Sequence, residues 1–182
     1  MEKSSIAYIL KLSIPIFFAN LAIPLVAIID TSLMGNLGNV SYLSATSVAA
    51  NLFSMIFWSF GFLRMGTVGM VSQANGAENY KEIINIILRN FLFVIILSIV
   101  LFFAQNLILK ISLKIFDLNL QTTTFYKEYF KIRIYSAPGE LTLYIIIGLF
   151  VGLQKTKISS IAVGFFSILN IILSIILVTQ YN

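Results

Sequence analysis

Five long apolar runs, nearly free of charged residues, constrain the fold of this chain more than any other feature of its sequence. About 20 apolar residues in a helix are enough to cross the roughly 30 Å hydrocarbon layer of a bilayer. The runs therefore predict an all-α membrane protein with about five transmembrane helices in one domain, residues 1–182. The expected spans are residues 9–33, 44–71, 90–109, 134–153 and 158–178.

The composition excludes most kinds of enzyme. Hydrophobic residues make up 59% and charged residues 10% of the chain, whereas ordinary soluble domains have about 45–50% and about 25%. Because the chain has no Cys and no His, thiol nucleophiles, disulfides, imidazole bases and the usual zinc or haem ligands are excluded. Neither a pair of acids at catalytic spacing nor a phosphate-binding Gly-rich loop occurs. We therefore expect an integral membrane protein with no catalytic residue, metal or cofactor, and a membrane enzyme is the least favoured function.

The net charge of +5 does not indicate a nucleic-acid partner. The basic residues stand singly between the apolar runs, without the basic and aromatic cluster that a nucleic-acid groove needs. In membrane proteins, Lys and Arg gather in the loops on the cytoplasmic side. A cytoplasmic N-terminus puts the majority of them on that side and the charge-free residues 35–43 outside. We expect this orientation in the cell (inner) membrane, with the lipid bilayer as a partner.

Asp30 is the main candidate for a functional residue. The first span carries no charge from Leu12 to Ile29 and then places this carboxylate before a Gly/Asn-rich turn. A carboxylate at membrane depth costs several kcal/mol, so such residues face a protein interior or a water-filled cavity and are usually functional. We predict that Asp30 binds H⁺ or Na⁺; the alternative is an acid at the membrane interface. Pro15 and Pro24 each remove a backbone donor and favour a bend, which either makes the helix a moving part or only shapes its packing.

Four other polar positions fall at or near membrane depth. Arg64 is expected near the cytoplasmic end of its span, with its guanidinium reaching the headgroups. Glu140 lies seven residues after Arg133, two helical turns along on the same face. An ion pair between them is one interpretation, and a solvated, interfacial Glu140 is favoured over a transport role. Asn170 is four residues before Ser174, so the two share a face of the fifth span.

Small residues and one long connection complete the expected layout. Glycines in the second span, at positions 61, 66 and 69, are expected to let another helix approach closely, and so is the Gly148-xxx-Gly152 pattern of the fourth span. Lys110–Arg133 is expected to be the longest polar connection, with aromatic rings at headgroup level.

Three stretches together resemble the multidrug and toxic compound extrusion (MATE) transporters, in the branch around DNA-damage-inducible protein F. They are residues 24–38 (PLVAIIDTSLMGNLG), residues 57–67 (FWSFGFLRMGT) followed by 73–77 (QANGA), and residues 132–138 (IRIYSAP) with 148–154 and 170–173 downstream. The piece FGFLRMGT is the most specific. The stretches cover nearly the whole chain in the family's order.

The resemblance implies twelve helices in two six-helix lobes, of which this chain supplies the N-terminal part; the sixth helix and the C-terminal lobe are absent. It also implies export of drugs or toxic organic compounds in exchange for H⁺ or Na⁺. In such families the acid at the Asp30 position takes part in cation binding, and the helix-five asparagine, here Asn170, contributes beside it. A second acid commonly follows four residues later, where this chain has Ser174. That neighbour lacks a charge, so a Na⁺ site would be poorer in hard anionic oxygens.

Two functions remain in view. The first is a cation-coupled efflux antiporter of small organic compounds, to which this chain contributes the N-terminal part. The alternative is a truncated, non-transporting membrane protein or a scaffold. Alternating access needs two halves that move against each other around a central site. A separately encoded C-terminal half is therefore a partner that transport would require. Asn170 has a further interpretation, an ordinary interhelical hydrogen bond, and the aromatic residues identify no substrate site.

Overall fold

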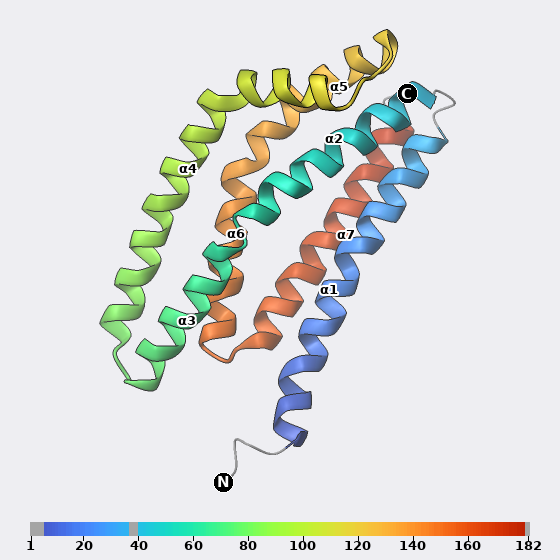
Figure 1. The fold of residues 1–182 in the computed structure, drawn as a ribbon. Coiled ribbons are helices and arrows are strands. Elements are labelled where there is room, and N and C mark those ends of the chain that lie inside the picture. The colour runs from blue at the N-terminus through green and yellow to red at the C-terminus, as the bar shows by residue number, and fades with distance from the viewer. Residues whose placement is uncertain (1–5, 37–39, 181–182) are drawn as a thin grey trace.

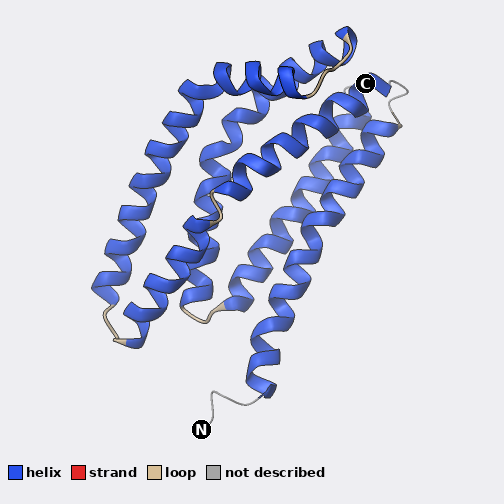
Figure 2. Cartoon of the chain, viewed as in Figure 1, coloured by secondary structure: helices blue, strands red, loops and turns tan. Residues whose placement is uncertain are grey.

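The computed structural model describes residues 6–36 and 40–180, and this part of the chain contains helices and short connections without a strand (Figures 1 and 2). The last two residues of the first MATE-like stretch, 37–38, lie outside it. The helices are α1 (Ile6–Gly35), α2 (Val40–Ser59), α3 (Phe62–Gly76), α4 (Tyr80–Ile115), α5 (Leu120–Arg133), the 3₁₀ helix η1 (Ile134–Ser136), α6 (Ala137–Gly152) and α7 (Thr156–Gln180).

The prediction of an all-α polytopic membrane protein is confirmed. Within the described residues, four helical stretches are long and apolar enough to cross a membrane: Val40–Gly76, Tyr80–Ile115, Leu120–Gly152 and Thr156–Gln180. α1 has 30 residues and includes the uncharged run 12–29, which makes it a fifth. The helices begin earlier or end later than the apolar runs, because helical hydrogen bonding continues into the headgroup region where apolar side chains are no longer needed.

The expected long connection, Lys110–Arg133, is helical over most of its length. α4 continues to Ile115, and after a short loop the side chain of Asn119 caps α5 by accepting a hydrogen bond from the Thr122 backbone N–H (2.8 Å). In Figure 1 the last part of α4 turns away from its upright direction and runs, with α5, across one end of the bundle. We call residues 110–133 the α4–α5 corner.

Two of the spanning stretches are broken. The stretch Val40–Gly76 is interrupted at Phe60–Gly61, between α2 and α3, and the stretch Leu120–Gly152 bends through η1. Arg64 falls in the first turn of α3, about 18 Å along that helix from its end at Gly76. Where Arg64 lies relative to the cytoplasmic headgroups stays a prediction. α1, in contrast, is one continuous helix through the positions of both of its prolines.

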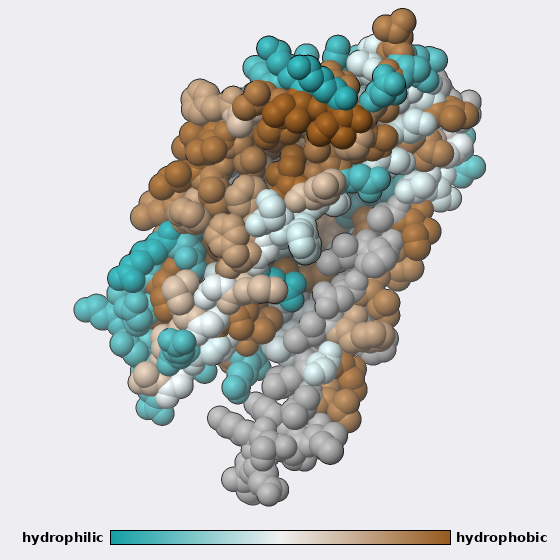
Figure 3. All heavy atoms as spheres, viewed as in Figure 1, coloured by the Kyte–Doolittle hydropathy of each residue, from teal (hydrophilic) through white to brown (hydrophobic). Residues whose placement is uncertain are grey.

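The helices form two packing groups. α6 packs on α3, with α4 against both, and α5 lies on α2, whereas α1 packs mainly on α7 (Figure 1). The largest apolar cluster joins α2, α4, α5 and α6 through residues such as Phe53, Phe130 and Leu141. Figure 3 shows apolar side chains over the middle of the visible face and hydrophilic ones towards its ends, as expected for a chain surrounded by lipid.

Candidate functional site

Asp30 lies near the end of α1, where this helix runs alongside α7 (Figure 1). Its side chain is half-buried. Within the part of the chain that the structure describes, no hydrogen bond or ion pair involves this carboxylate.

Asn170 and Ser174 lie one helical turn apart on α7, the neighbour of α1. Asn170 is exposed and Ser174 is half-buried. The fold thus brings the helix of Asp30 against the helix that carries both other predicted residues. The described residues include no hydrogen bond from Asp30 to either side chain, so their role in cation binding stays a prediction.

Glu140 forms an ion pair with Arg133, the interpretation that the sequence left open beside a solvated Glu140. Arg133 Nη2 lies 3.1 Å from Glu140 Oε1, and the side chains are 39% and 33% exposed. The pair closes across η1, so it connects the end of α5 to the first turn of α6. Tyr144, one turn further along α6, lies within electrostatic range of both Glu140 and the Arg64 guanidinium from α3.

A second polar contact, which the sequence did not indicate, joins α3 to α4. Asn90 Nδ2 donates a hydrogen bond to Thr67 Oγ1 (2.9 Å), and the Thr67 hydroxyl donates to the Leu63 carbonyl oxygen (2.6 Å). Thr67 is fully buried. In a membrane, a buried pair of this kind satisfies polar groups that lipid cannot. The only sequence signal was the polar Asn90 at the start of an apolar run.

The close helix contact of this bundle is made by α6. A methyl group added at Gly148 would lie 2.7 Å from Thr67 Cβ, and one at Gly152 would lie 2.8 Å from Val71 Cβ. The predicted small-residue face of α6 is confirmed. The same expectation for α3 is wrong. In the described structure, a methyl group added at Gly66 or Gly69 would have no neighbouring atom within 4 Å.

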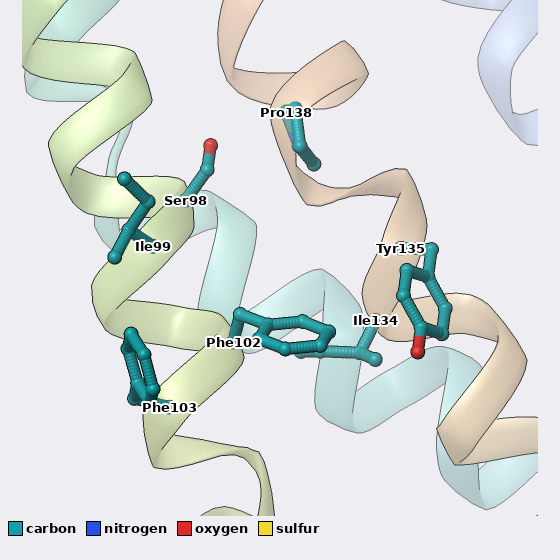
Figure 4. Close-up of a pocket in the computed structure, with 7 residues that line it drawn as sticks. All are labelled: Ser98, Ile99, Phe102, Phe103, Ile134, Tyr135 and Pro138. Carbon is teal, nitrogen blue, oxygen red and sulfur yellow. The ribbon is translucent and has the colours of Figure 1, made fainter.

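The sequence also missed a recess between α4 and the η1–α6 segment. Its volume is about 250 Å³, and Figure 4 shows the residues that line it: Ser98, Ile99, Phe102, Phe103, Ile134, Tyr135 and Pro138. The Ser98 Oγ atom is buried without a hydrogen-bond partner in the described structure. Among the described residues, no three His, Cys, Asp or Glu side chains gather closely enough to hold a metal ion.

Comparison with known proteins supports the resemblance seen in the sequence. The family model described as MatE matches residues 15–176. The chain is 29% identical over 167 residues to DNA damage-inducible protein F of Escherichia coli (strain K12), covering 92% of this chain and 36% of that protein. The chain thus spans about a third of the length of the curated relative it matches. No solved structure matches it significantly.

Proposed function

This chain belongs to the MatE family, and we propose that it is the N-terminal part of a transporter that exports toxic organic compounds in exchange for H⁺ or Na⁺. Membership of a transporter family also supports a function other than catalysis. The coupling cation is the only small ion that the proposal requires, and no cofactor is part of it.

The observation that carries the proposal is the packing of α1 on α7. α1 brings a half-buried carboxylate, Asp30, and α7 brings the amide of Asn170 and the hydroxyl of Ser174. Oxygen atoms of these types are ligands for hard cations, and a carboxylate at membrane depth is functional by default. Either H⁺ or Na⁺ would neutralise Asp30 and remove the cost of keeping a charge there.

Neutralisation gives a way to couple cation binding to movement. A ligand shifts a conformational equilibrium only when it binds one state more tightly than the other. In one state Asp30 would face water, where its charge is tolerated, and in the other it would lie among apolar side chains. Cation binding would favour the second state by removing the charge, and α1 and α7 would move relative to α3 and α6.

Transport by this mechanism needs a second half of the protein, because alternating access requires two halves around a central site. In a relative such as the E. coli protein, the part outside the 36% that this chain matches would correspond to that second half. The proposed orientation has the N-terminus in the cytoplasm of a cell whose inner membrane holds the protein. A non-transporting membrane protein or scaffold is the alternative function.

The test is transport by a fusion of this chain to the remaining length of the E. coli relative. Reconstituted in vesicles with an imposed H⁺ or Na⁺ gradient, the fusion should expel ethidium, and Asp30→Asn should reduce expulsion to the level of empty vesicles. The matched control is Asp117→Asn, the same chemical change at an exposed acid between α4 and α5. This control should transport normally.

Three results would contradict the proposal. Gradient-driven transport that survives Asp30→Asn would remove the cation role of this residue. A fusion that inserts in the membrane, melts cooperatively and yet expels no dye under either gradient would favour the scaffold function. Equal loss in both Asp variants would indicate that any change of charge harms the fold, and would also count against a specific site.

A further inference from the structure

The recess between α4 and the η1–α6 segment lies at the surface of the described structure. Phe103 and Tyr135 on its rim are 81% and 67% exposed, and the rings of Phe102 and Tyr135 lie with their centroids 5.4 Å apart. Figure 4 shows these rings side by side at one end of the recess, with Ser98 and Pro138 at the other. An apolar recess of this shape at membrane depth accommodates a hydrocarbon chain.

Basic side chains are concentrated in the α4–α5 corner, which directly precedes the recess residues Ile134 and Tyr135 in the chain. The α4–α5 corner contains five basic residues, of which four are exposed lysines: Lys110, Lys114, Lys127 and Lys131. It contains only two acids, Asp117 and Glu128. Lys131 lies one helical turn before Tyr135 of the recess. The corner is also amphipathic, because α5 buries Thr122, Tyr126 and Phe130 on its opposite face.

We propose that the recess and the α4–α5 corner together bind one anionic phospholipid. Its acyl chain occupies the recess, and its phosphate is held by the exposed lysines. Basic residues attract anionic headgroups electrostatically. With the proposed cytoplasmic N-terminus the corner lies on the outer side, so this lipid belongs to the outer leaflet. Amphipathic helices lie at the boundary between headgroups and acyl chains. The corner runs across one end of the bundle (Figure 1), and it ends at Arg133, next to Ile134 and Tyr135 of the recess. A headgroup held at the corner would then lie beside an acyl chain in the recess.

A small apolar molecule with a hydrogen-bond acceptor is the competing occupant, because the buried Ser98 hydroxyl has no partner in the described structure. The charge around the recess favours the lipid. A neutral ligand bound through Ser98 would not need lysines, whereas an anionic headgroup would be attracted by the four exposed lysines of the adjoining corner. The proposal does not depend on the transport function.

The experiment places a fluorescent reporter in the recess of the full chain. Trp58 is the sole tryptophan, so Trp58→Phe combined with Phe103→Trp leaves one indole on the rim. In vesicles, brominated phosphatidylglycerol and brominated phosphatidylcholine are compared as quenchers at equal mole fraction. We expect the anionic lipid to bind about fivefold more tightly, the effect of roughly one lysine at the membrane surface.

Control variants test where the preference for the anionic lipid arises and which residues cause it. The unmodified chain reports from Trp58, an 83% exposed side chain on α2, and should be quenched equally by both lipids. Lys110→Gln with Lys131→Gln should abolish the preference reported by the indole of the Phe103→Trp variant. Lys81→Gln with Lys157→Gln, the same loss of charge at exposed positions on the opposite end, should leave it unchanged.

Ile99→Trp in the Trp58→Phe background is a second reporter on the same rim and covers the case of a Phe103 variant that does not fold. Equal quenching by the two lipids at both reporters would overturn the proposal. A preference that survives the loss of Lys110 and Lys131 would do the same. If Ser98→Ala increases quenching by both lipids equally while the lysine variants change nothing, the occupant of the unmodified recess is a small molecule bound to Ser98 and the lipid assignment is wrong.

Discussion

The α3–α6 and α1–α7 interfaces of this chain are built in opposite ways. α6 meets α3 through Gly148 and Gly152, at distances that leave no room for one added methyl group. α7 lies along α1, but in the described structure the residues it buries, Thr156 and Ser159, are confined to its first turn. Its Gly164 has open space around it.

This difference predicts that the α3–α6 pair is rigid and that the α1–α7 pair is the part that moves. Closely packed helices resist displacement, because the interior of a protein is as dense as an organic crystal. The α1–α7 pair carries Asp30, Asn170 and Ser174, and Gly164 of α7 has no described atom within 4 Å of an added methyl group, unlike Gly148 and Gly152 of α6. We therefore expect the proposed cation site to lie on the movable pair and the α3–α6 pair to act as the rigid support.

The largest effect should come from filling the close contact. Gly148→Ala should lower the free energy of unfolding by about 1–3 kcal/mol, the usual cost of overpacking. Gly164→Ala is the matched control, and it should leave stability unchanged or raise it by up to about 1 kcal/mol, because alanine is the better helix residue. Thermal melting of both variants in the same detergent micelles measures the difference. Equal destabilisation by the two changes would contradict the difference in packing between the α3–α6 and α1–α7 interfaces.

A smaller loss of stability is expected from removing the hydrogen bond between Asn90 of α4 and Thr67 of α3. Thr67→Val keeps the shape of the side chain but removes the acceptor for Asn90 Nδ2. Interhelical hydrogen bonds in membranes are worth about 0.6 kcal/mol on average, so the loss of stability, measured by the same thermal melts, should be of that size. Asn90→Leu in the Thr67→Val background should then cost little more, and a large additional cost would show that Asn90 has a further role.

The Arg133–Glu140 pair should contribute least. Both side chains are partly exposed at the surface of the described structure, and ion pairs exposed to water are worth about 0.2–1 kcal/mol. A double-mutant cycle with Arg133→Gln and Glu140→Gln should give a coupling energy near the lower end of that range, falling as salt is added. A coupling energy above that of the Thr67–Asn90 contact would show that η1 is held mainly by charge.

The sequence predicted the helices well because long apolar runs have few alternatives in a bilayer. It failed at α5, since the polar outer face of Lys127, Glu128 and Lys131 hid a buried stripe at Thr122, Tyr126 and Phe130. The Asn119 cap was the local signal that identifies this helix. The glycines show a second limit: Gly148 and Gly66 look alike in the sequence, and only the position of a neighbouring helix decides which of them is in close contact.

The candidate site was predictable as residue types but not as an arrangement. Asp30 stands out because a charge ends a long apolar run. That α1 packs on α7, and so approaches the helix of Asn170 and Ser174, depends on contacts between segments far apart in the chain. The recess at Ser98 could not be predicted for the same reason, since separate segments of the chain form it.

The bend of α4 has a consequence for the thickness of membrane that the protein fits. A straight helix of its 36 residues would be about 54 Å long, far more than the roughly 30 Å of hydrocarbon. Because the last part of α4 runs across the end of the bundle, only its upright part needs to match the bilayer. A thicker membrane can be matched by drawing residues from the bend into the upright part, so hydrophobic mismatch would change the shape of this helix before it distorts the lipid.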